Sequence, residues 1–272
     1  MNQPCPSPGS GARPQLAYSN EEFLRKADAR PLRILSEYLE PLSHFRAQGI
    51  TDTIVFFGSA RVQEDGLMAR YYEDARQLAS LVTIWSEAFS NHAKRFVICS
   101  GGGPGIMEAA NRGAMEAGGK TIGLNIGLPF EQFPNPWISP ELNFEFHYFF
   151  MRKFWFAYLA KALVVFPGGF GTMDELFEIL TLVQTQKLKK KIAIVLYGSE
   201  YWKEVINFPA FLKHGMISEA DLALFHFADT PAQAMAILKD KLHEAGHTHA
   251  AEAPEIAGTA GPFDALDGTG LA

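Results

Sequence analysis

The chain has 272 residues, of which 47% are hydrophobic and 20% charged, and its formal net charge is −6 at pH 7. This composition is typical of a globular protein with a full core, and the length allows one large α/β domain or two small ones. The negative charge argues against broad binding to nucleic acids or anionic membranes. Because there are two cysteines and no apolar run near the roughly 18 residues of a membrane span, we expect a cytoplasmic protein without disulfides.

Composition divides the chain into four parts. Residues 1–17 and 246–272 are poor in large apolar side chains, so we expect a disordered leader and a disordered tail. Residues 18–50 carry apolar residues at helical spacing, which predicts an N-terminal helical extension that is broken or kinked at Pro41. Residues 51–245 form the predicted main domain.

Strands and helices are predicted to alternate along the main domain. The strands are expected at 53–57, 95–99, 121–125, 143–146, 162–166, 191–196 and 224–227, and the helices at 67–90, 105–117, 148–160, 172–186, 201–213 and 230–244. This alternation indicates an α/β fold, a Rossmann-like doubly wound parallel sheet with an N-terminal helical extension. Ligands of such sheets bind beyond the carboxyl ends of the strands.

The most informative segment is the glycine-rich turn at residues 167–172, here called the phosphate turn, which joins a predicted strand to a predicted helix. Its backbone N–H groups would point outward at the positive end of a helix dipole, where they can hold a phosphate. Glu175 adds a carboxylate one turn into the helix. An alternative is a capping box, in which Thr172 and Glu175 satisfy the free N–H groups of the helix. The expected phosphate-binding residues are Gly168, Gly169, Gly171 and Thr172.

Two further glycine-rich turns follow predicted strands, at residues 58–59 and 100–105. The second holds four glycines in five residues, and their conformational entropy cost favours close approach of a ligand over a plain connection. It does not match the dinucleotide-binding fingerprint, because Ile106 and Glu108 stand where glycine would be needed. The residues expected to face the sugar or base are Gly58, Ser59, Gly102 and Gly103.

Arg152 and Lys153 lie in a strongly aromatic predicted helix. Adjacent helical positions point about 100° apart, so at most one of them faces a given site. We prefer Arg152, because a guanidinium suits bidentate contact with phosphate or carboxylate, although both side chains could instead extend to solvent over aromatic rings. The eight histidines show no metal-ligand spacing, and we predict no metal site.

Together these motifs resemble the LONELY GUY family, whose members were once labelled lysine decarboxylase-like. The resemblance covers residues 54–242 and implies an enzyme that needs no metal or organic cofactor. Such an enzyme hydrolyses the N-glycosidic bond of AMP or a cytokinin riboside 5′-monophosphate, which releases the base and ribose 5-phosphate. It is carried by Pro167-Gly168-Gly169-x-Gly171-Thr172-x-x-Glu175, Met151-Arg152-Lys153, Gly101-Gly102-Gly103-Pro104-Gly105-Ile106-Met107-Glu108-Ala109-Ala110-Asn111 and Phe57-Gly58-Ser59-Ala60-Arg61.

The resemblance implies catalytic roles for Arg152 and Glu175, with Lys153 among the sugar- or base-binding residues. Glu175 would offset the charge of an oxocarbenium-like transition state and help activate water, and Arg152 would keep it ionised. The implied partners are a nucleoside monophosphate and further copies of the chain, as a homodimer or larger, with no nucleic acid and no membrane. Two alternatives stay open: a non-catalytic carrier of a nucleotide or molybdenum cofactor, and an amino-acid decarboxylase dependent on pyridoxal phosphate.

Overall fold

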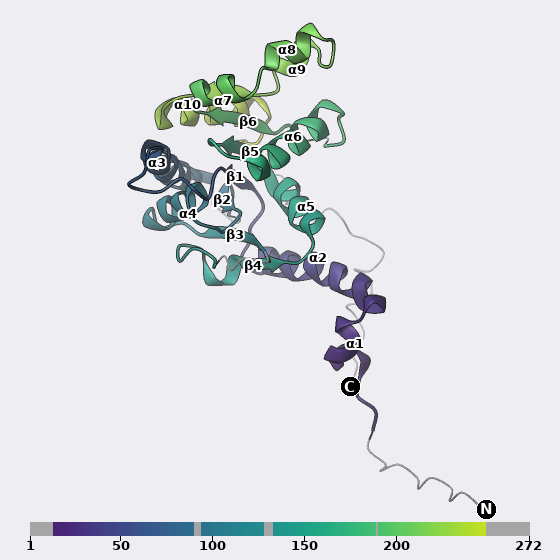
Figure 1. The fold of residues 1–272 in the computed structure, drawn as a ribbon. Helices are drawn as coiled ribbons and strands as arrows, with labels where there is room; N and C mark the ends of the chain where they lie inside the picture. The colour runs from purple at the N-terminus through teal and green to yellow at the C-terminus, as the bar shows by residue number, and fades with distance from the viewer. Residues whose placement is uncertain (1–12, 90–93, 128–132, 189, 249–272) are drawn as a thin grey trace, which may run out of the picture.

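A seven-stranded parallel sheet forms the middle of the molecule (Figure 1), with the strand order β4-β3-β2-β1-β5-β6-β7. The structure is a computed structural model that describes residues 13–89, 94–127, 133–188 and 190–248. The strands are β1 (Thr53–Phe57), β2 (Val97–Ser100), β3 (Thr121–Ile126), β4 (Asn143–Phe146), β5 (Ala160–Val165), β6 (Ala193–Tyr197) and β7 (His226–Ala228). Every pairing is parallel and the chain order reverses between β1 and β5, which confirms the predicted Rossmann-like α/β fold.

Helices cover both faces of the sheet. They are α1 (Glu21–Arg25), α2 (Arg30–Ala47), α3 (Ala69–Ser86), α4 (Ile106–Glu116), α5 (Phe149–Leu159), α6 (Phe170–Gln184), α7 (Ser199–Val205), α8 (Phe208–Lys213), α9 (Glu219–Leu222) and α10 (Pro231–Glu244). Short 3-10 turns lie at Ala17–Ser19, Ala27–Ala29, Glu87–Phe89 and Pro140–Leu142. Within the described ranges, none of these helices has the length and apolarity needed to cross a membrane.

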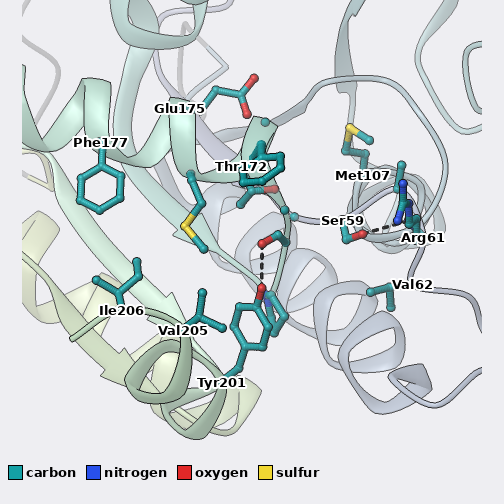
Figure 2. Close-up of a pocket in the computed structure, with 18 of the residues that line it drawn as sticks. Ser59, Arg61, Val62, Met107, Thr172, Glu175, Phe177, Tyr201, Val205 and Ile206 are labelled. Atoms are coloured by element: carbon teal, nitrogen blue, oxygen red, sulfur yellow. Dashed lines mark hydrogen bonds between the residues drawn. The ribbon is translucent and has the colours of Figure 1, made fainter. Parts of the chain in front are cut away.

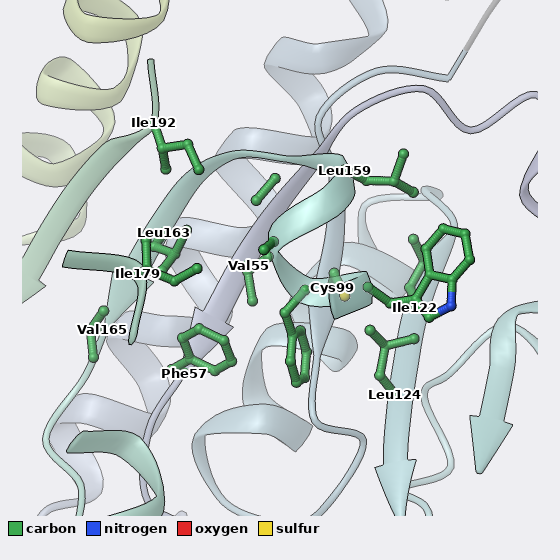
Figure 3. Close-up of a cluster of buried hydrophobic side chains, with 14 of the residues drawn as sticks. Val55, Phe57, Cys99, Ile122, Leu124, Leu159, Leu163, Val165, Ile179 and Ile192 are labelled. Carbon is green, nitrogen blue, oxygen red and sulfur yellow. The ribbon is translucent and has the colours of Figure 1, made fainter. Parts of the chain in front are cut away.

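Alternate residues of each central strand supply two separate cores. In β1, Val55 and Phe57 pack into one hydrophobic cluster, while Ile54 and Phe56 pack into the other, because successive side chains point to opposite faces. The first cluster, part of which is shown in Figure 3, lies under α2, α5 and α6, and the second lies under α3, α4 and α10. Burial on both faces explains why the central strands are continuous apolar runs.

The N-terminal extension shares the first of these cores. Leu42 and Phe45 of α2 are buried in the same cluster as the sheet residues. Of the break or kink predicted at Pro41, the break is wrong, since α2 runs without interruption from Arg30 to Ala47. A proline leaves the carbonyl four residues earlier without its helical donor. That carbonyl belongs to Glu37, and it accepts a hydrogen bond from the Trp155 indole N–H at 3.0 Å.

Other element boundaries also differ from the prediction. The helix predicted at 201–213 is two helices, α7 and α8, because the Asn207 side chain accepts from the Ala210 N–H and starts a new helix. The last strand lies at 226–228 rather than 224–227. The predicted tail lies mostly outside the described residues, but His247 still hydrogen-bonds through its ring to the Lys191 carbonyl at 3.0 Å. Most of the predicted leader, residues 1–12, likewise lies outside them.

Candidate active site

The carboxyl ends of β1 and β5 lie side by side, because Phe57 pairs with Val165. The chain order reverses there, and doubly wound sheets bind ligands at such a point. The turns that follow also touch, since the Ser59 N–H donates to the Pro167 carbonyl at 3.0 Å. A cavity of about 1500 Å³ opens beyond these strand ends, and both turns line it (Figure 2).

The phosphate turn leads into α6 without any side-chain cap. The helix begins at Phe170, two residues earlier than predicted, and Gly169 is its N-cap. The capping-box alternative is therefore wrong, because neither Thr172 nor Glu175 caps the helix. Within the described residues, the backbone N–H groups of positions 169–172 have no hydrogen-bond acceptor. They remain available at the positive end of the α6 dipole, in a turn that lines the cavity.

The glycines of the phosphate turn serve different purposes. A Cβ at Gly168 would overlap the Thr172 hydroxyl, so packing inside the turn excludes a side chain there. A Cβ at Gly169 or Gly171 would meet no atom within 4 Å. These two positions leave open space over the turn, which lets a ligand reach the backbone.

Arg152 of α5 and Glu175 of α6 form a buried ion pair on the wall of the same cavity. The Arg152 Nη2 donates to the Glu175 Oε1 at 3.0 Å, and the two side chains are only 10% and 13% exposed. The guanidinium lies over the rings of Phe149 and Phe156, 5.3 Å from each ring centroid. Such cation–π contacts hold a charged group that burial would otherwise disfavour. Within the described residues, the buried Nε of Arg152 has no hydrogen-bond partner.

Burial raises the pKa of Glu175 to about 7, although the Arg152 charge opposes this rise. The neighbouring Asp174 carboxylate raises the pKa further. Near neutral pH the Glu175 carboxyl can therefore either accept or donate a proton. Groups that titrate near the working pH are suited to acid–base catalysis.

A family model described as "Possible lysine decarboxylase" matches residues 107–238, a range that begins just after the second glycine-rich turn and includes Arg152, the phosphate turn and Glu175. The cytokinin riboside 5'-monophosphate phosphoribohydrolase of Rhodococcoides fascians is 29% identical over 118 residues. Both matches agree with the resemblance of the chain to the LONELY GUY family. The alignment covers 43% of this chain and 58% of that relative's length.

One solved structure shows the same fold as this protein. The X-ray structure of TM1055 aligns over 70% of this chain and 99% of its own, with a TM-score of 0.50 and 20% identity. A Moco carrier protein from Chlamydomonas reinhardtii aligns over 71% of this chain and 99% of its own, with a TM-score of 0.48 and 23% identity. At 20% identity, the likeness to TM1055 shows that the fold is shared.

Lys153, the neighbour of Arg152 in the family motif, does not line the cavity. Its ammonium pairs with Asp174 at 2.7 Å and with Glu178 at 3.0 Å, on a different side of α6 from the one that carries Glu175. The prediction that Lys153 faces the sugar or base is thus not matched by its position. Of the two adjacent cations, the structure brings only Arg152 to the cavity.

Gly102 and Gly103 also lie outside the cavity lining. A buried network of hydrogen bonds holds their turn in place. The Asn135 side-chain amide donates to both glycine carbonyls at 3.0 Å, and the Gly102 N–H donates to the Ser100 hydroxyl at 3.0 Å. Gly102 has a φ of +75°, and a Cβ there would overlap Asn125. Internal packing therefore explains why residue 102 is a glycine, which we had expected to make room for a ligand.

The first turn does line the cavity, through both Gly58 and Ser59. A Cβ at Gly58 would come within 2.6 Å of Ile106, so the glycine is required where β1 passes the start of α4. The Ser59 hydroxyl accepts a hydrogen bond from the Arg61 N–H at 3.0 Å, which leaves its own proton for a ligand.

Sequence reasoning missed the wall that α7 and α8 contribute to the cavity. One signal could have found this wall. Because β6 is parallel to its neighbour β5, the segment that follows β6 begins at the same edge of the sheet as the phosphate turn. Arg61 was also missed as a cavity residue. The lining residues from this wall are Tyr201, Val205, Ile206, Asn207, Ala210, Phe211, His214 and Met216.

Proposed function

We propose that this protein is a nucleoside 5′-monophosphate phosphoribohydrolase. It hydrolyses the N-glycosidic bond of AMP or of a cytokinin riboside 5′-monophosphate, and it releases the free base and ribose 5-phosphate. The observation that carries the proposal is the buried Arg152–Glu175 pair beside an uncapped helix start in one cavity. The match to the family model and the activity named for the Rhodococcoides relative support it.

The substrate phosphate binds at the phosphate turn in this proposal. The N–H groups of positions 169–172, which have no acceptor among the described residues, and the α6 dipole suit a dianion without any side-chain cation. The Thr172 side chain is buried against Gly168, so its hydroxyl is held beside the turn. In the proposal, one end of the nucleotide is held at the turn and its ribose extends toward Glu175.

Glu175 acts on the ribose as the glycosidic bond breaks. Positive charge develops on the sugar in an oxocarbenium-like transition state, and a carboxylate close to it stabilises that charge. The same carboxylate orients the ribose hydroxyls and accepts a proton from the attacking water, while the departing base nitrogen takes up a proton, so that one water molecule is consumed overall. Arg152 holds Glu175 in place through its 3.0 Å hydrogen bond.

The description of the family model raises decarboxylation as another activity. A decarboxylase that uses pyridoxal phosphate needs a lysine to hold the cofactor as a Schiff base. Among the residues that the structure describes, those lining the cavity include no lysine, and Lys153 is engaged by two carboxylates outside it. The residues present do not fit that cofactor, and we assign it no role.

The function is tested by incubating the purified protein with a panel of nucleoside monophosphates and measuring free base by chromatography. Glu175→Gln should keep the fold and AMP binding but lose about 10²- to 10⁴-fold in the rate of base release. Glu178→Gln is the matched control, because it makes the same change on α6 at a residue that contacts Lys153 outside the cavity. Base release by Glu175→Gln at the wild-type rate would contradict the mechanism, and binding of AMP without turnover by the wild type would indicate a carrier.

A further inference from the structure

We propose that Tyr201, whose hydroxyl is bonded to the Gly168 carbonyl, is a positioning residue that aims the phosphate turn at the substrate. This inference rests on the proposed function and adds a residue that acts through the turn. The Tyr201 Oη donates to the Gly168 carbonyl at 2.8 Å, and both residues line the cavity (Figure 2). The contact joins α7 to the phosphate turn across the cavity wall.

Peptide geometry links this hydrogen bond to phosphate binding. The Gly168 carbonyl and the Gly169 N–H belong to one planar trans peptide, so they point in opposite directions. A donor that holds the carbonyl on the Tyr201 side therefore directs the Gly169 N–H to the other side. That N–H is the first of the unpaired donors that precede and open α6.

The Tyr201 ring has a fixed position because its helix is anchored at two points. The next residue, Trp202, is fully buried, and its indole N–H donates to the carbonyls of Val165 at 3.2 Å and Tyr197 at 3.0 Å. At the start of α7, the Ser199 N–H donates to Asp229 at 2.7 Å. Val165 ends β5 and directly precedes the segment that leads to the phosphate turn. Successive residues of α7 thus contact the end of β5 and the turn that follows it.

The hydroxyl also stays in the protonated form that this role requires. Burial raises the pKa of Tyr201 above its ordinary value near 10, so the group remains a donor at any working pH. Without the hydroxyl, the Gly168 carbonyl would lose the one side-chain donor that it has among the described residues. The glycine on each side of that peptide bond would allow the unit to rotate.

The test compares Tyr201→Phe with Tyr72→Phe. Tyr72 is the matched control because its hydroxyl also makes a protein hydrogen bond, to Glu108 on α4, but lies outside the cavity lining. Calorimetry should show that Tyr201→Phe binds ribose 5-phosphate roughly 3- to 10-fold more weakly than wild type, the size expected for one neutral hydrogen bond. In the base-release assay, KM for AMP should rise by the same factor while kcat is retained, and Tyr72→Phe should change neither value.

Wild-type affinity of Tyr201→Phe for ribose 5-phosphate would overturn the positioning role, and so would a fall in kcat with KM unchanged. Failure of the proposed function gives a different result. In that case the wild type releases no base from any nucleotide, yet the binding comparison with ribose 5-phosphate still reports on Tyr201. A wild type that binds neither ribose 5-phosphate nor inorganic phosphate would overturn both the phosphate turn and its positioning residue.

Discussion

Two opposing effects, burial and the charge of Arg152, determine the pKa of Glu175. Burial disfavours the carboxylate, and the nearby Asp174 charge disfavours it further. Arg152 works in the other direction through its charge and its hydrogen bond, but burial dominates and the pKa rises to about 7. A carboxylate on a surface helix would be ionised throughout the physiological range, whereas this one changes its charge within it.

This pKa predicts the pH dependence of catalysis. The mechanism uses the deprotonated form, so kcat/KM should rise with pH, bend near pH 7 and reach a plateau above it. At pH 6 it should be about tenfold below the plateau, because about one carboxyl in ten is then ionised. Initial rates of base release from AMP between pH 5 and pH 9 measure this curve.

The substrate phosphate also titrates, about one pH unit lower, so the curve needs an independent check. Carbon-13 NMR of glutamate-labelled free protein should show one carboxyl resonance that titrates near pH 7 and is missing in Glu175→Gln. A resonance that titrates near 4.5 instead would contradict the assignment of the kinetic pKa to Glu175.

Residue chemistry alone favoured Arg152 over Lys153 as the side chain that faces the cavity. It did not predict the contacts that Lys153 makes. The preference for arginine followed from its planar, bidentate donors, and the structure places that side chain against Glu175. The partners of Lys153, Asp174 and Glu178, lie on another element. Such contacts depend on how α5 and α6 pack, which spacing within one helix cannot reveal.

At the scale of elements, the start of α6 predicts opposite outcomes for two glycine substitutions. Gly168→Ala should lower the free energy of unfolding by about 1–3 kcal/mol, because its Cβ would overlap Thr172. Gly171→Ala should leave stability unchanged or slightly higher, because the site is open and alanine favours a helix. Its methyl group would instead stand over the turn and raise KM for AMP. Urea unfolding and steady-state kinetics of both variants measure these two effects separately.

Equal stability of the two alanine variants would show that Thr172 yields to the added methyl group at Gly168. Equal KM values for wild type and Gly171→Ala would place the phosphate away from this part of the turn.

Elements were predicted well where the local sequence pattern determines them. They were predicted poorly where a residue distant in the sequence determines them. The apolar runs of the sheet and the glycine-rich connections indicated the fold and the edge that carries the site. The break at Pro41 was wrong because Trp155, over a hundred residues later, satisfies the freed carbonyl. The second glycine-rich turn was assigned to a ligand because the sequence did not reveal that Asn135 folds back onto it.

At the scale of the whole molecule, the N-terminal extension holds the helix that carries Arg152. The Glu37 carboxylate of α2 accepts hydrogen bonds from the backbone N–H groups of His147 at 2.8 Å and Tyr148 at 3.2 Å, next to the start of α5. No side chain of α5 or its N-cap provides this cap. A negative charge at the positive end of a helix dipole is stabilising. Removing this carboxylate should therefore affect the active site through α5, although Glu37 does not line the cavity.

Glu37→Ala should lower the free energy of unfolding by about 1–2 kcal/mol, the range typical of a lost helix cap. It should also lower kcat/KM for AMP, because Arg152 lies in the first turn of α5 and its position depends on how that turn is held. Glu40→Ala is the matched control, since it removes the same charge from an exposed position one turn along α2. Urea unfolding and base release should leave the Glu40 variant close to wild type. If Glu37→Ala loses stability but retains full kcat/KM, the extension supports the fold without positioning Arg152.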